Sequence, residues 1–141
     1  MENLFVTATN LYSLRAIIAA YNNGYYLECV VLIFACLASI IYHLSETKHG
    51  MNSLCLKKYS NITLNMDRFF AVFSTFVLLW KCKEKINKQI MYYGFIGLIA
   101  QGLSESQHVI SLPLKIEKVL YLITHPIWHF CAFHCAYMLV K

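Results

Sequence analysis

The most restrictive feature of the chain is a nearly continuous apolar stretch at residues 25–43, YYLECVVLIFACLASIIYH. A bilayer core about 30 Å thick is crossed by a helix of roughly 20 apolar residues, and this stretch has that length. The whole chain of 141 residues is 59% hydrophobic and only 13% charged, which is unusual for a soluble domain. We therefore expect an integral membrane protein.

Four further segments have a composition that suits membrane helices. Because a segment in lipid must satisfy its own backbone hydrogen bonds, each is expected to be helical. The sequence thus predicts an all-α, polytopic transmembrane bundle that forms a single domain over residues 1–141. It has about five spans, at residues 4–21, 25–43, 66–80, 89–105 and 116–140.

The net charge of +5 comes mostly from lysines in the short polar segments between these spans. No basic stripe with interleaved aromatic side chains is present, so we do not expect a nucleic-acid partner. Three lysines in the loop at 44–65 nearly balance four in the segment KCKEKINK at 81–88, which leaves the orientation open. The compartment is equally open, with the plasma membrane and an endomembrane both compatible.

Five polar residues stand where lipid should exclude them. Ser39 and His43 are four residues apart at the end of the second span, and His125 and His129 have the same spacing in THPIWHF. Residues at i and i+4 lie on one face of a helix, and Asp67 opens the predicted third span. Ionisable residues inside a membrane usually face the bundle and serve a function.

These residues are also expected to lie on the same side of the membrane, where they can meet. Successive spans cross in alternate directions, so the end of the second span, the start of the third and the start of the fifth all lie on one side. Three neutral imidazoles with an open fourth position are typical of catalytic zinc. We therefore predict that Zn²⁺ binds His43, His125 and His129. Asp67 is then the candidate general base, and Ser39 the residue that orients water or stabilises an oxyanion.

The remaining histidines are not predicted to be ligands. His134 follows His129 by five residues, about 140° around the helix, and so lies on another face. His49 and His108 fall in loops and are expected to be solvated. The glycines at 94, 97 and 102 of the fourth span are expected to let neighbouring helices approach closely.

The order SxxxH, then D, then HxxxH on separate membrane helices resembles the CREST superfamily of membrane hydrolases. Within it, YYLECVVLIFACLASIIYHLSE, MDRFFAVF and HPIWHFCAF are most similar to the myomaker-like branch, also called transmembrane protein 8. The resemblance implies that the three histidines hold zinc, with Asp67 and Ser39 beside the metal-bound water. It also implies hydrolysis of an amide or ester bond in a membrane lipid.

The chain is shorter than this resemblance implies, because the family core has seven helices and the sequence predicts about five. The wall of the lipid cavity would then be incomplete, and a homo-oligomer is one arrangement that would complete it.

Two other interpretations fit the same residues. The first is a non-enzymatic protein with a structural zinc, since the namesake of the myomaker branch is known for membrane fusion between cells. The second is a decayed family member without metal. Taken singly, each histidine can instead bond a neighbouring helix, Ser39 a backbone carbonyl, and Asp67 the N-terminal dipole of its helix.

Overall fold

The computed structural model describes residues 2–105 and 113–141, which are all-helical and contain no strand. Short 3₁₀ turns lie in the connections, and one, η1 (Asn10–Tyr12), joins α1 to α2. The helices are α1 (Glu2–Thr9), α2 (Ser13–Asn22), α3 (Tyr26–Ser45), α4 (Ser60–Lys81), α5 (Lys88–Glu105) and α7 (Leu114–Val140). The prediction of an all-α fold is therefore confirmed.

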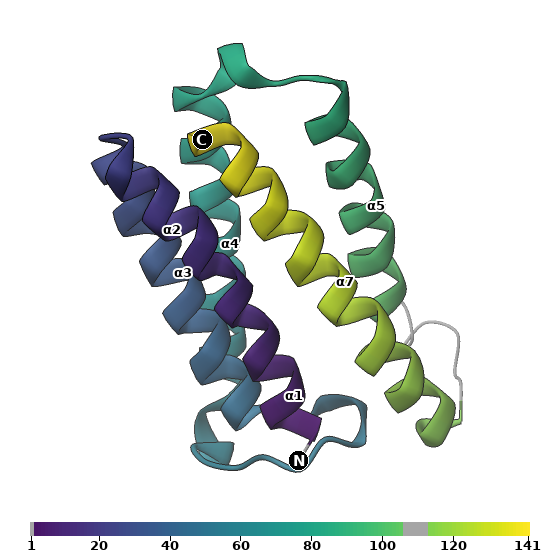
Figure 1. Ribbon diagram of the computed structural model, residues 1–141. Coiled ribbons are helices and arrows are strands. Elements are labelled where there is room, and N and C mark those ends of the chain that lie inside the picture. The colour runs from purple at the N-terminus through teal and green to yellow at the C-terminus, as the bar shows by residue number, and fades with distance from the viewer. Residues whose placement is uncertain (1, 106–112) are drawn as a thin grey trace.

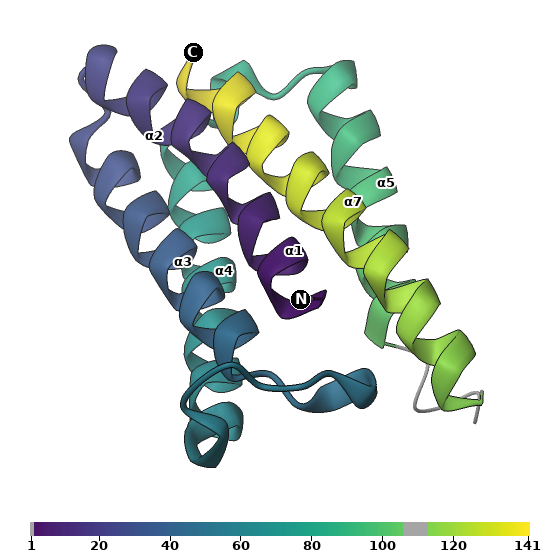
Figure 2. The ribbon, with the colours of Figure 1, turned by 60° about the horizontal axis from the view of Figure 1, so that its bottom comes forward.

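The helices pack side by side around α7 (Figure 1). On one flank α7 contacts α1 and α2, and on the other it packs along α5. The helix α3 packs on α4 and α2. The N-terminus, the connection between α3 and α4 and the start of α7 lie at one end of the bundle, and the C-terminus lies at the other (Figures 1 and 2). The helices thus run in alternate directions along the bundle, in the order of crossings that the sequence predicts.

Three helical stretches are long and apolar enough to cross a membrane, namely Glu2–Asn22, Tyr26–Ser45 and Lys57–Lys81. They indicate a membrane protein. Three histidines lower the hydropathy of α7, and two of them, His125 and His129, are residues that suggest a functional site. That α5 and α7 also cross the membrane stays a prediction.

The first span has low hydropathy because it contains several polar side chains. They are accommodated because they face the protein interior. Asn3, Asn10 and Ser13 are each no more than 1% exposed. Arg15, the charge within this span, lies on the outer surface with its guanidinium 3.8 Å from the centre of the Tyr137 ring. A cation over an aromatic face is stabilised by the ring quadrupole.

The helix α4 begins six residues earlier than predicted. Residues 60–65 are predicted as a loop because they are polar. The Thr63 hydroxyl, however, donates to the carbonyl of Ser60, 3.0 Å away, so its hydrogen bond is made within the helix. As a result Asp67 lies two turns inside α4. The interpretation of Asp67 as an N-terminal dipole partner is therefore wrong.

Of the glycines of α5 described above, one brings two helices close together. A Cβ atom at Gly97 would lie 3.0 Å from Cβ of Cys131 and 3.4 Å from the Trp128 ring on α7. Gly94 and Gly102 have no such neighbour within 4 Å. The prediction of close packing is confirmed for Gly97 and wrong for the other two.

This contact can be tested by a pair of alanine variants. We expect Gly97→Ala to lower the free energy of unfolding by about 1–3 kcal/mol, because the new methyl group overpacks the contact with Cys131. In contrast, Gly102→Ala meets open space and is expected to be neutral, or stabilising by up to about 1 kcal/mol through helix propensity. Thermal or denaturant unfolding in detergent measures both. Equal losses in the two variants would contradict the contact.

Candidate metal centre

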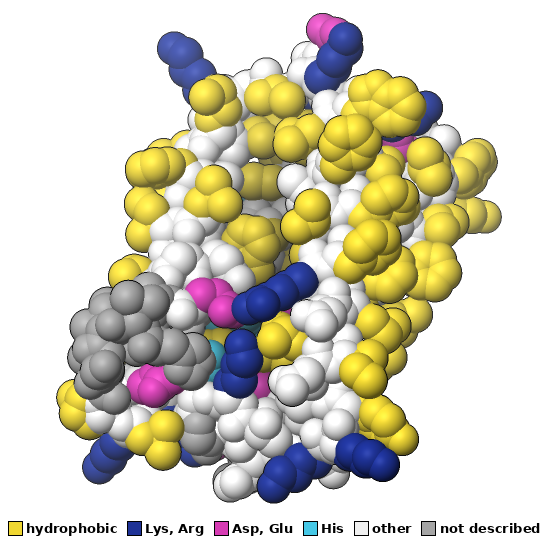
Figure 3. Space-filling model, turned by 180° about the vertical axis from the view of Figure 1, so that it is seen from behind, with side chains coloured by type: hydrophobic (Ala, Val, Ile, Leu, Met, Phe, Trp, Pro, Cys, Tyr) yellow, Lys and Arg dark blue, Asp and Glu magenta, His cyan; other side chains and the backbone are white. Residues whose placement is uncertain are grey.

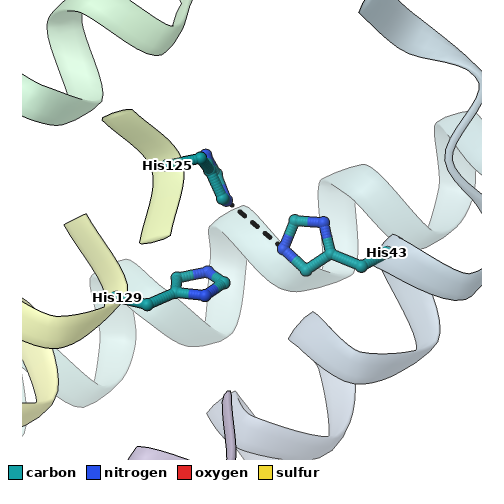
Figure 4. A group of neighbouring side chains, drawn as sticks. All are labelled: His43, His125 and His129. Carbon is teal, nitrogen blue, oxygen red and sulfur yellow. Dashed lines mark hydrogen bonds between the residues drawn. The ribbon is translucent and has the colours of Figure 1, made fainter. Parts of the chain in front are cut away.

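Three buried histidines meet between α3 and α7 (Figure 4). His43 comes from the last turns of α3, and His125 and His129 come from one face of α7. Their exposed fractions are 0%, 4% and 4%. One ring nitrogen of each lies within 4.8 Å of the others, so the cluster could hold a metal ion.

The spacing of two of these nitrogens suits a metal with tetrahedral coordination. Nε2 of His43 and Nε2 of His125 are 3.3 Å apart. Two nitrogens bound to one tetrahedral zinc at its usual bond length lie about 3.3 to 3.4 Å from each other. The two rings therefore need little movement to share an ion.

A carboxylate fixes the orientation of His43. Glu46, one turn later in the chain and completely buried, places Oε2 3.0 Å from Nδ1 of His43. A carboxylate accepts hydrogen bonds only, so Nδ1 of His43 carries the proton and donates it. In a neutral imidazole this leaves the lone pair on Nε2, the nitrogen that faces the cluster.

His129 is oriented in the same way by a hydroxyl group. The Thr9 hydroxyl donates to the carbonyl of Val6, 2.6 Å away, and lies 2.6 Å from Nδ1 of His129. Because its single proton is already committed, the Thr9 oxygen accepts from Nδ1–H of His129. The lone pair of His129 is therefore on Nε2.

His125 has a similar but longer contact. The Ser104 hydroxyl, fully buried on α5, donates to the carbonyl of Gln101 at 2.9 Å and lies 3.5 Å from Nδ1 of His125. His43 and His129 thus each have an oxygen acceptor close to Nδ1, and Nε2 of His125 faces Nε2 of His43. Outer contacts of this kind are the usual companions of metal-binding histidines.

Glu46 is the centre of a larger buried network. Its Oε1 accepts from the Tyr42 hydroxyl at 2.9 Å, and its Oε2 accepts from the Tyr121 hydroxyl at 2.8 Å. The Asn3 amide donates to the backbone carbonyls of His43 and Glu46, at 2.8 and 3.1 Å. These contacts join α1, α3 and α7 around one carboxylate and fix the end of α3.

Ser39 and Asp67 lie beside the histidines. Both line a cavity of about 80 Å³ together with His129, and their side chains interact with each other. Ser39 is 5% exposed, whereas Asp67 is half-buried. The structure thus brings all five predicted site residues together, and their chemical roles stay predictions.

His49 is buried, so the prediction that it is solvated is wrong. Its backbone has a φ of 55°, and its ring stacks on Tyr121 with 4.4 Å between the ring centres. Nδ1 of His49 lies 2.8 Å from the Glu117 carboxylate. The connection between α3 and α4 therefore folds against the start of α7, next to the histidine cluster. His108 lies outside the described residues.

The other donor atoms do not join the cluster. His134 contacts the Tyr12 hydroxyl at 3.3 Å and stacks on Phe130, on another face of α7 as the helical angle predicts. Cys36 of α3 contacts the carbonyl of Asn10 and is not part of the group. Within residues 2–105 and 113–141, the group that could hold a metal consists of the three histidines alone.

Comparison with known proteins gives the family of the chain. Residues 1–134 match the model of a family described as a protein of unknown function, DUF3522. The chain belongs to this family. No curated protein and no solved structure matches it. The family description names no activity, so the function is argued from the site.

Reasoning from the sequence did not find the residues that support the ligands, among them Glu46, Thr9 and Ser104. For Glu46 a local signal exists, because HLSE places a carboxylate at i+3 from His43, within reach on a helix. Thr9 and Ser104 contact histidines more than 20 residues away, and no spacing in the sequence indicates those pairs.

Proposed function

We propose that the protein is a multi-pass membrane protein that binds Zn²⁺ through His43, His125 and His129 and hydrolyses an amide or ester bond in a membrane lipid. One observation carries the proposal. Three buried imidazoles each place a ring nitrogen within 4.8 Å of the others, with no fourth protein ligand in the described residues, beside a small cavity that holds a carboxylate and a hydroxyl group.

The donor set favours zinc in a catalytic role. Neutral imidazoles suit zinc, and structural zinc sites are closed by four protein ligands, whereas catalytic sites use three. When bound, zinc would lower the pKa of a water molecule to about 7 and polarise a carbonyl group.

The side chains of the cavity suit the proton transfers of hydrolysis. Water adds to the carbonyl carbon of the lipid, and Asp67 accepts the proton that the water loses. The Ser39 hydroxyl donates a hydrogen bond to the carbonyl oxygen as negative charge develops there. Asp67 then passes the proton to the departing nitrogen or oxygen. The C–N or C–O bond breaks, and a carboxylic acid and an amine or alcohol leave.

A lipid substrate is supported by the surroundings of the cluster. The outer faces of the helices carry exposed apolar side chains, such as Phe69 and Phe76 on α4 and Phe95 on α5. The motifs that resemble the myomaker-like branch of the CREST superfamily support the same substrate class. A plasma membrane or endomembrane location and assembly as a homo-oligomer belong to the same proposal.

The proposed reaction predicts a specific loss of activity in one variant. In proteoliposomes that contain a panel of long-chain amides and esters, we expect release of fatty acid to fall by about 10²- to 10⁴-fold in Asp67→Asn, because the proton acceptor is removed. The zinc content is expected to stay unchanged.

The control variant is Glu84→Gln, which removes an exposed carboxylate beside Lys83 in the connection between α4 and α5. It is expected to keep the parental rate. If the zinc-loaded parent hydrolyses none of the panel, the proposed hydrolase activity is refuted. The result would favour a non-enzymatic protein with a structural zinc. Equal rates in Asp67→Asn and the parent would remove Asp67 from the mechanism.

A further inference from the structure

The helices α4 and α5 are separated by an apolar groove whose floor is α7. The cavity has a volume of about 470 Å³, within the range of small-molecule sites. Nearly all of its lining is apolar. Viewed from behind, the molecule is hollowed between two ridges of apolar side chains, and charged side chains cross the lower part of the hollow (Figure 3).

The groove adjoins the cavity of the candidate metal centre. Five residues line both, and they come from α4 and α7: Thr75, Leu78, Trp128, Ala132 and Ala136. Beyond this shared wall the lining changes from apolar to polar, where Ser39, Asp67 and His129 begin. One continuous surface therefore leads from the apolar groove to His129.

The open side of the groove faces outward between two apolar helix faces. Met91, Phe95 and Leu98 of α5 line the groove and are each 66% exposed. At the end nearest the histidines, Arg68 of α4 and Glu105 of α5 form an ion pair of 2.8 Å across the gap. The groove is thus apolar along its length and charged at one end, which matches the polarity of a lipid.

We propose that this groove holds the hydrocarbon chain of the lipid substrate, which enters sideways from the bilayer between α4 and α5. This inference rests on the proposed function and specifies how the substrate lies. The carbonyl group of the lipid lies at Ser39 and Asp67, the chain extends along α5 past Gly94, and the polar headgroup lies toward Arg68 and Glu105.

Two glycines of α5 provide a matched test. Gly94 lines the groove, and a Cβ atom there would meet no atom within 4 Å, so a larger side chain would project into the space that the hydrocarbon chain needs. Gly102 lies on the same helix with equally open space, but it is not part of the groove lining. The variants Gly94→Phe and Gly102→Phe therefore add the same side chain inside and outside the proposed site.

The probe is a long-chain fatty amide with a photoreactive diazirine near the end of its chain, incorporated into proteoliposomes. After illumination, peptide mass spectrometry maps the attached probe. We expect the parent to be labelled at groove residues such as Met91 and Leu98. Labelling should fall by about tenfold or more in Gly94→Phe, because the new ring occupies the groove and the hydrocarbon chain loses its apolar contacts with the wall. Labelling should persist in Gly102→Phe. If Gly94→Phe does not fold, Gly94→Leu replaces it.

The result is independent of the metal, because labelling requires no turnover. Equal labelling in the two variants, or labelling confined to other surfaces, would overturn the groove as the binding site even if the protein contains zinc and hydrolyses lipids. Labelling that only Gly94→Phe removes, in a protein without zinc, would support the groove and refute the proposed hydrolase.

Discussion

Replacing Glu46 with alanine is expected to lower the affinity for zinc by roughly 10- to 100-fold, the usual cost of removing a residue that orients a metal-bound histidine. The free energy of unfolding is expected to fall by about 3 kcal/mol or more, because buried donors lose their acceptor. Those donors are the Tyr42 and Tyr121 hydroxyl groups and Nδ1–H of His43.

The measurement combines chelator competition for zinc with denaturant unfolding in detergent. Glu105→Ala is the control, because that carboxylate pairs with Arg68 in a partly exposed position, where a salt bridge contributes at most about 1 kcal/mol. If Glu46→Ala binds zinc as tightly as the parent, Glu46 does not orient His43 for a metal. Its network would then be purely structural.

The second large effect is expected when ligands are removed. In the double variant His125→Ala, His129→Ala, only the imidazole of His43 remains from the cluster, and one neutral ligand does not retain zinc through purification. Zinc added to metal-free parent protein is expected to raise the melting temperature, because an ion that binds only the folded state stabilises it. The double variant should show no such rise.

His134→Ala is the matched control for this experiment. It removes a histidine of the same helix that contacts Tyr12 and Phe130 rather than the cluster. We expect this variant to keep both the zinc and the zinc-dependent rise in melting temperature. An equal loss in His134→Ala and in the double variant would indicate that metal loss follows from disturbed packing of α7.

The convergence of the five polar residues was predictable because it depends on helix geometry and the order of crossings. The spacing in SxxxH and in HxxxH places each pair on one helical face. The alternating direction of the helices brings the end of α3, the first half of α4 and the first half of α7 to the same end of the bundle. Both arguments use only local spacing and the number of helices, which the apolar segments define.

The supporting residues and several boundaries depend on tertiary contacts that local patterns do not encode. Thr9 lies in the first predicted span, whose low hydropathy comes from polar side chains that face the protein interior. Histidines also lower the hydropathy of α7, so the residues that mark the site weaken the evidence that this helix crosses a membrane. The burial of His49 likewise depends on a positive φ and on its contact with Glu117, on a distant helix.

The most direct test of the account is the zinc content per chain, measured by elemental analysis of detergent-purified parent protein alongside the double variant His125→Ala, His129→Ala. The three converging imidazoles predict about one zinc per chain in the parent and none in the variant. A well-folded parent without zinc, which also takes up none when zinc is added, would contradict both the hydrolase and a structural zinc site. The histidines would then serve only to pack the helices.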